Sequence, residues 1–175
     1  MDASVAALLG AGLGVLGTVL AAAVNSRTSA RSQEQLLASE AEGKKLDSLQ
    51  EAVDAAGSAL ERMHWALMAA VQLGRFSAAP SGEDWDEALD EIEHARAETS
   101  LQGTRLAVRL GTHAECVGAY DEKKDQYWEF IKVVSSIETG PAVDIDKVEK
   151  DLGTLGKDHR FLDLAALLLK PASVT

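Results

Sequence analysis

The sequence predicts an all-α protein with an N-terminal transmembrane-type helix, a polar helical stalk and a four-to-five-helix bundle. Residues 5–24 carry no charge and no proline. Downstream, apolar side chains recur every three or four positions, and no alternating apolar–polar run of useful length occurs, which argues against a sheet. We therefore expect a membrane anchor over residues 1–25, a stalk over residues 26–45 and a cytosolic bundle over residues 46–175.

The apolar segment VAALLGAGLGVLGTVLAAAV, residues 5–24, is long enough to span a bilayer. At a rise of about 1.5 Å per residue it covers roughly 30 Å, the thickness of the hydrocarbon core. Its leucines and valines favour insertion by only about 0.3–0.6 kcal/mol each, so a helix buried in a soluble oligomer is the alternative. A signal peptide fits less well because the leader, residues 1–4, holds an acid where a positive charge belongs.

Basic residues lie on one side of this segment only. Arg27, Arg31, Lys44 and Lys45 follow it, and no lysine or arginine precedes it. Because cytoplasmic flanks of membrane helices are enriched in lysine and arginine, we expect a single-pass protein of the cell membrane. Its N-terminus would lie outside and its body in the cytoplasm.

Small side chains form a stripe along the apolar helix. The stripe has a spacing of four and consists of Ala6, Gly10, Gly14, Thr18 and Ala22. Small residues at this spacing let two membrane helices approach closely, so the stripe predicts self-association through the N-terminal helix. The alternative is that glycine and alanine are simply common in membrane helices.

The composition argues against an internal disulfide framework and against nucleic acid as a partner. The only cysteine, Cys116, rules out an internal disulfide framework. Residues 80–175 carry −9 of the net charge of −11. Because nucleic-acid phosphates require a basic face, we expect no nucleic acid among the partners.

The body begins with its clearest helix. Residues 26–45 are polar, and Gly43 is a candidate break before a long amphipathic pattern. The pattern alternates spacings of three and four, and its members are Leu46, Leu49, Val53, Ala56, Leu60, Met63, Leu67 and Ala70. This is the pattern of one wall of a helical bundle, although a coiled-coil oligomer would show it as well.

Three or four further helices follow. Ser81 is placed to cap a helix whose buried face would be Trp85, Ala88, Leu89, Ile92, Ala95 and Thr99. The run RLAVRL, residues 105–110, fits either a frayed helix or an extended connector. Thr112 and Glu115 have the spacing of a capping box, so a helix should begin at His113 and run to about Glu138. Shorter helices are expected over residues 145–155 and 161–169, the second docked on the bundle.

The arrangement resembles a known group in outline. A membrane helix rich in small residues, then Arg27 and Arg31, a long helix, and a helix pair joined near VRLG at residues 108–111 are similar to a diffuse group of uncharacterised membrane-anchored helical-bundle proteins of bacteria. The resemblance covers most of the chain and implies a fold without an activity. This chain departs from the group in having few arginines after the span.

Two Glu-x-x-His pairs are the weak metal candidates. Glu61 with His64 and Glu91 with His94 have the spacing that di-iron carboxylate bundles use on paired helices. All four positions lie beside the rows of apolar residues that are predicted to face the core, and none lies within them. Solvated flank residues are therefore the preferred interpretation, and no metal or other cofactor is expected.

Other chemistry has little support in the sequence. His113 and Cys116 would share the first helical turn, where the helix dipole lowers a thiol's pKa. No third partner or phosphate-binding glycine loop accompanies them, and a lone cysteine usually packs as a small apolar residue. We therefore expect a protein that is not an enzyme.

Aromatic residues offer one further interpretation. Trp65, Trp85 and Trp128 could form a docking surface for a partner, or they could complete the bundle core. The preferred function is a membrane-anchored scaffold, adaptor or sensor that acts through contacts with an unknown protein partner. The alternative is a membrane effector or pore-forming protein whose N-terminal helix oligomerises, although Thr18 is the only polar side chain available to line such a pore.

Overall fold

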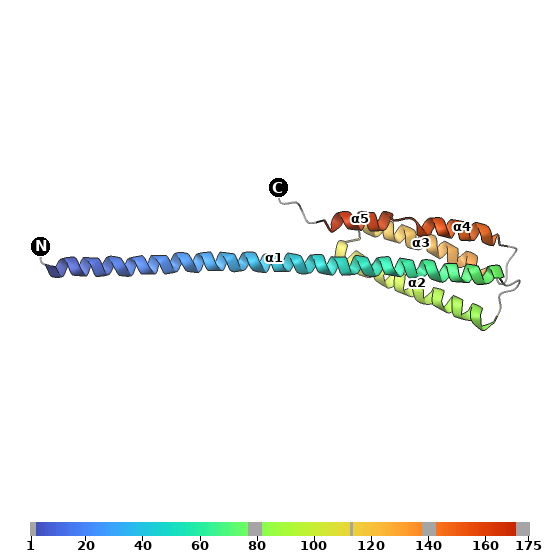
Figure 1. Cartoon of the computed structure of the whole chain (residues 1–175), viewed down its shortest axis with the longest axis horizontal. Helices are drawn as coiled ribbons and strands as arrows, with labels where there is room; N and C mark the ends of the chain where they lie inside the picture. The colour runs from blue at the N-terminus through green and yellow to red at the C-terminus, as the bar shows by residue number, and fades with distance from the viewer. Residues whose placement is uncertain (1–2, 77–81, 113, 138–142, 171–175) are drawn as a thin grey trace. The chain divides into compact units, whose positions relative to one another are not determined.

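The computed structural model describes residues 3–76, 82–112, 114–137 and 143–170, and for residues 3–31 it describes the backbone alone. The described residues form helices and contain no strand, which confirms the all-α prediction. The helices are α1 (Ala3–Phe76), α2 (Glu83–Leu110), α3 (Glu115–Ser135), α4 (Ile145–Gly156) and α5 (Arg160–Leu168), as Figure 1 shows.

The chain divides into two compact units, Met1–Lys45 and Leu46–Thr175. The first unit is the N-terminal part of α1. The break expected at Gly43 is wrong, because α1 continues through that residue. One glycine in a helix costs only about 1 kcal/mol relative to alanine, and its neighbours Ala41, Glu42, Lys44 and Lys45 are strong helix formers.

The predicted membrane segment, residues 5–24, lies outside the residues whose side chains the structure describes. Among the residues that it does describe, no helix combines the length and the apolar character needed to cross a bilayer. The small-residue stripe Ala6, Gly10, Gly14, Thr18 and Ala22 falls in the same segment, so its packing role stays a prediction.

The second unit is an antiparallel helical bundle. The C-terminal part of α1 runs beside α2, and α3 contacts α2, α4 and α5 (Figure 1). Helices α4 and α5 follow one another along one side of the bundle. The predicted α1 seam is buried at Val53, Ala56, Leu60, Met63, Leu67 and Ala70. Its first member, Leu46, is 40% exposed, so the buried seam begins further along than the pattern indicates.

Helix α2 follows its predicted face and extends past it. Trp85, Ile92, Ala95 and Thr99 are buried as expected, and the helix continues to Leu110, so the RLAVRL run is helical. Gly111 then ends it with a φ of 83° and donates its N–H to the carbonyl oxygen of Ala107 at 2.8 Å. A positive φ favours glycine, which has no Cβ to clash.

The capping box predicted for α3 does not form. The helix begins at Glu115, two residues later than expected, and its N-cap is Ala114 without a side-chain hydrogen bond. The Ala114 N–H instead donates to the carbonyl oxygen of Gly111 at 3.2 Å, in the turn that ends α2. Ser81 lies outside the described residues, and the N-cap of α2 is Gly82.

Helices α4 and α5 follow the sequence pattern with one qualification. Asp144 caps α4 by accepting a hydrogen bond from the Lys147 N–H at 3.1 Å. In α5, Phe161 and Ala165 are buried, whereas the side chains of Leu162, Leu167 and Leu168 are 41%, 61% and 47% exposed. Only one face of this apolar helix is therefore docked.

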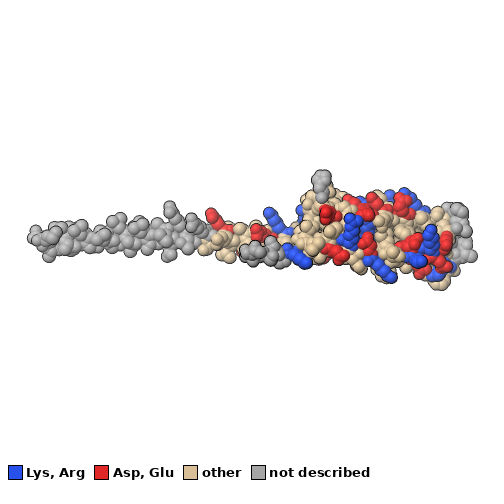
Figure 2. All heavy atoms as spheres, turned by 90° about the horizontal axis from the view of Figure 1, so that it is seen from above, with Lys and Arg blue, Asp and Glu red and all other residues tan. Residues whose placement is uncertain are grey.

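Ion pairs join the helices at the bundle surface. Arg62 pairs with Glu98 of α2, and Arg75 pairs with Glu149 of α4 at 2.6 Å and with Asp146. Such exposed pairs contribute about 0–1 kcal/mol each, so they add little to the stability of the bundle. Figure 2 shows lysine and arginine side chains interspersed with aspartate and glutamate over the bundle face in view.

Candidate functional site

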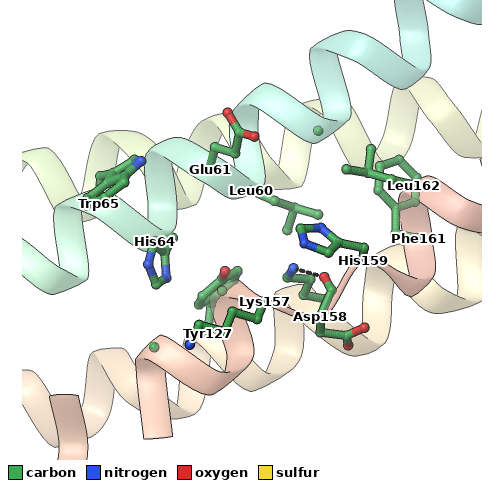
Figure 3. A pocket seen from close by; sticks show the side chains of 14 residues that line it. Leu60, Glu61, His64, Trp65, Tyr127, Lys157, Asp158, His159, Phe161 and Leu162 are labelled. Carbon is green, nitrogen blue, oxygen red and sulfur yellow. Dashed lines mark hydrogen bonds between the residues drawn. The ribbon is translucent and has the colours of Figure 1, made fainter. Parts of the chain in front are cut away.

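The bundle contains a cavity of about 460 Å³ where the α4–α5 junction meets α1 and α3 (Figure 3). Pockets of about 300–1,000 Å³ are the size that small ligands occupy. The lining residues are Gly57, Leu60, Glu61, His64 and Trp65 from α1, Lys123 and Tyr127 from α3, and Gly153, Gly156, Lys157, Asp158, His159, Phe161 and Leu162 from the α4–α5 region. Helices distant in sequence therefore converge on one site.

Lys123 provides the buried charge of the cavity. It lies in α3 between Tyr120 and Tyr127 and is only 9% exposed. Its Nζ donates a hydrogen bond to the carbonyl oxygen of Asp158, and within the described ranges no carboxylate forms an ion pair with it. Burial lowers the pKa of Lys123, and the carboxylates of Asp158 and Glu61 oppose that shift in part.

His64 faces the same cavity from α1. Burial lowers the pKa of its ring, and the positive charge of Lys123 lowers that pKa further. Its Nδ1 is buried and has no hydrogen-bond partner among the described residues. The ring centroid lies 6.1 Å from that of Tyr127 and 5.4 Å from that of Trp65. The imidazole is therefore held neutral beside two aromatic rings near pH 7.

Glycines bring the α4–α5 junction close to α1. A Cβ on Gly156 would lie 2.6 Å from the Cε1 atom of His64, a distance at which one of the two would have to move. A Cβ on Gly57 would lie 3.4 Å from Leu162, whereas a Cβ on Gly153 would meet nothing within 4 Å. The absence of side chains at these positions contributes to the space of the cavity.

The remaining polar groups decide what the cavity can hold. The pKa of Tyr127 is raised, first by burial and then by the charges of Asp158 and Glu61, so its hydroxyl stays protonated near pH 7. The Asp158 carboxylate accepts the Arg160 N–H at 3.0 Å at the start of α5. In Figure 3 the Glu61 carboxylate points away from Tyr127. The cavity therefore combines apolar walls, hydrogen-bond donors and one buried cation.

The structure does not bring the two Glu-x-x-His pairs together. Glu61 and His64 both line the cavity, whereas Glu91 and His94 are exposed on α2 and are not among its lining residues. The His94 Nδ1 lies 2.8 Å from the carbonyl oxygen of Asp90 in its own helix. The described part of the chain holds no group of three or more His, Cys, Asp or Glu side chains arranged to bind a metal.

The structure describes only one member of the second candidate pair, His113 and Cys116. His113 lies outside the described residues, so its distance from Cys116 stays untested. Cys116 is buried, and its Sγ lies 4.0 Å from the carbonyl oxygen of Phe161. Burial raises the pKa of this thiol, the opposite of what a nucleophile needs.

The three tryptophans have different environments. Trp85 is buried in the core, as the packing interpretation predicts. Trp128 is half-buried between the Arg96 guanidinium and the Lys124 ammonium, each 5.2 Å from its ring centroid. Trp65 is 67% exposed beside the cavity. Of the three, Trp65 is the one available for contact with a ligand or partner.

We predict that His64 makes the bundle less stable in mild acid. Its folded pKa lies below the unfolded value of about 6.5, so the unfolded chain binds more protons in that window. The stability contributed by neutral His64 is therefore present above the unfolded pKa and is lost as the pH falls through the folded pKa. Urea unfolding at about pH 7.5 and about pH 5.5 measures this loss.

Two variants isolate the contribution of His64 to that pH dependence. His64→Gln should unfold with a smaller difference in free energy between the two pH values than the wild type. The exposed His94→Gln variant should keep the wild-type difference. Equal pH dependence in wild type and His64→Gln would contradict the prediction.

Comparisons of the chain with protein-family models, curated proteins and solved structures find no match. Its function therefore has to be inferred from its own sequence, cavity and surface. The cavity residues that the sequence analysis missed as a site are Lys123, Tyr127 and the α4–α5 junction, residues 157–159.

Proposed function

We propose that this chain is a membrane-anchored helical bundle that acts through protein–protein contacts, as a scaffold, adaptor or sensor. The observation that carries the proposal is the uncharged segment over residues 5–24. It falls within α1, Ala3–Phe76, and a helix satisfies its backbone polar groups internally, as a bilayer requires. The basic residues that follow the segment favour a cytoplasmic body.

Exposed apolar side chains support the contact function. Trp65, Phe76 and Val108 are 67%, 85% and 80% exposed on the second unit. Single exposed apolar residues are common on soluble surfaces, but tryptophan and phenylalanine are enriched where proteins meet. The partner we propose is a protein whose apolar side chains cover such positions.

The small-residue stripe supports self-association as a second contact. Gly10 and Gly14 would let two anchors approach closely in the bilayer, where apolar side chains alone give little preference for each other over lipid. Thr18 offers little polar lining for a water-filled channel, so packing into a dimer or small oligomer is favoured over a pore.

We expect Val15→Arg to release the full-length chain from membranes. An arginine at the centre of a span costs about 2.5–3.5 kcal/mol, which is comparable to the modest net gain expected from the leucines and valines of this segment. The matched control is Val108→Arg, the same change at an exposed position of the bundle. Alkaline extraction of membranes, followed by detection of a C-terminal tag, separates the two variants.

The wild type and Val108→Arg should stay in the membrane pellet, and Val15→Arg should move to the supernatant. Recovery of the wild type as a soluble monomer would contradict the anchor. Protease added to sealed, right-side-out vesicles should leave the tagged body intact if it is cytoplasmic. Depolarisation of cells that express the wild type would favour the pore-forming alternative over a scaffold.

A further inference from the structure

We propose that the cavity between α1, α3 and the α4–α5 junction binds a small organic carboxylate with an apolar body, held by the Lys123 ammonium. The inference goes beyond the anchored-bundle function and does not depend on the anchor. It rests on three features of the cavity: a buried cation without a carboxylate partner, an apolar wall, and open volume beside a glycine.

The buried cation is the first feature. Lys123 is nine-tenths buried, and its Nζ donates to the Asp158 carbonyl oxygen while forming no ion pair within the described ranges. An ammonium can donate three hydrogen bonds, and among the described residues Lys123 forms the one to Asp158. Taking a charge out of water is costly, and the Asp158 and Glu61 carboxylates attract Lys123 without forming an ion pair with it. A bound anion in direct contact with the ammonium would supply a closer counter-charge.

The apolar lining of the cavity favours a ligand whose uncharged part is apolar. Leu60, Phe161 and Leu162 form apolar walls, and Figure 3 shows Phe161 and Leu162 at the end of the cavity opposite the His64 ring. The volume of about 460 Å³ exceeds what a bare inorganic anion fills. The Tyr127 hydroxyl and the His64 ring also line the cavity and offer further polar contacts, so one molecule can meet both polar groups and apolar walls.

Charge favours a monoanion over a dianion. Glu61 and Asp158 lie at the same cavity, and their attraction partly offsets the effect of burial on Lys123. A phosphate dianion would face these two carboxylates with one buried lysine as its counter-ion, whereas proteins commonly bind phosphate with arginine forks or several backbone N–H groups. A carboxylate carries one negative charge and matches the single buried cation, Lys123.

The direct test is a comparison of 4-fluorophenylacetate with its neutral amide, 4-fluorophenylacetamide. The full-length chain is measured in lipid nanodiscs if it is recovered from membranes, with empty nanodiscs as the blank, and in plain buffer if it is recovered in solution; fluorine NMR measures binding in either case. We expect the carboxylate to bind at least ten-fold more tightly than the amide, because the two share an apolar ring and differ in charge. Equal affinities would overturn the proposal.

Neighbouring lysines provide a matched pair of variants. Lys123→Met removes the buried charge and keeps an apolar stem, and we expect at least a ten-fold loss of carboxylate affinity. Its unfolding midpoint should not fall, because replacing a buried charge by an apolar side chain is often neutral or stabilising. Lys124 pairs with Asp121 at 2.6 Å and is not a cavity residue, so Lys124→Met should bind as the wild type does.

A glycine pair tests the location without altering charge. Gly153→Leu adds a side chain beside the cavity where a Cβ meets nothing within 4 Å, and it should weaken the binding of carboxylate and amide alike. Gly118→Leu makes the same change at an exposed position of α3 away from the cavity and should leave binding unchanged. Wild-type affinity in Gly153→Leu or in Lys123→Met would place the ligand elsewhere and overturn the assignment.

Competition distinguishes the sources of the carboxylate. Displacement of the fluorinated probe by octanoate but not by 4-phenylbutyrate would indicate a lipid-derived chain, and the reverse would indicate an aromatic metabolite. Inorganic phosphate should not displace the probe at equal concentration. Displacement by phosphate would contradict selection of an apolar body.

Discussion

Leu67→Ala is expected to lower the free energy of unfolding of the bundle by about 2–5 kcal/mol. Leu67 lies in the middle of the buried seam of α1, and its side chain has no exposed surface. The substitution removes buried methyl groups and leaves a cavity that the surrounding helices fill only in part. Urea unfolding of the full chain, followed by the fluorescence of buried Trp85, measures the change.

Leu37→Ala is the matched control for that measurement. Leu37 lies in the same helix and is 66% exposed, so the same truncation should change the free energy by less than about 0.5 kcal/mol. A change of similar size in the two variants would contradict the assignment of the Leu67 loss to core packing. The prediction therefore separates the buried part of α1 from its exposed part.

The spacing of apolar residues in the sequence predicted most of the bundle, because a packed helix must carry its apolar side chains on the face that it buries. The α1 seam from Val53 to Ala70 is buried as its spacing indicates, and the α2 face from Trp85 to Thr99 is buried except at Ala88 and Leu89, which are half-buried. Leu46 fits the same pattern but is 40% exposed, since spacing identifies a face of a helix and cannot show where a neighbouring helix stops covering it.

Helix ends were harder to predict because they depend on the preceding turn. Thr112 and Glu115 have the spacing of a capping box, yet Ala114 bonds to Gly111 in the turn that ends α2. Gly43 looked like a break, but an isolated glycine among strong helix formers does not end a helix.

One feature of the sequence does point to the cavity. Tyr120 and Tyr127 lie seven residues apart on the buried face of α3, so the position between them that shares this face must be 123 or 124, and both are lysines. Lys123 is the one that is buried. The cavity beside it could not be predicted, because His64 and Gly156 come together only after α1 and α4 have packed.

Gly103→Ala is expected to destabilise the bundle although it adds a good helix former to α2. The new Cβ would lie 2.8 Å from the Cε1 atom of Tyr120. That ring is fully buried, its hydroxyl donates to the Thr99 carbonyl oxygen at 2.8 Å, and the Phe161 ring packs edge-on against it at 5.3 Å between centroids. The cost of overpacking, about 1–3 kcal/mol, therefore exceeds the gain in helix propensity of about 0.5–1 kcal/mol.

Gly118→Ala is the opposite case on the facing helix α3 and is expected to stabilise the bundle by about 0.5–1 kcal/mol. Gly118 is exposed, and a Cβ there would meet nothing within 4 Å. Urea midpoints of the two variants should move in opposite directions from the wild type, since both gain the same helix propensity and only Gly103 meets a fixed ring. A urea midpoint for Gly103→Ala at or above that of the wild type would contradict the prediction. It would mean that the Tyr120 ring can move without losing its hydrogen bond to Thr99, and that the α2–α3 contact is looser than its geometry indicates.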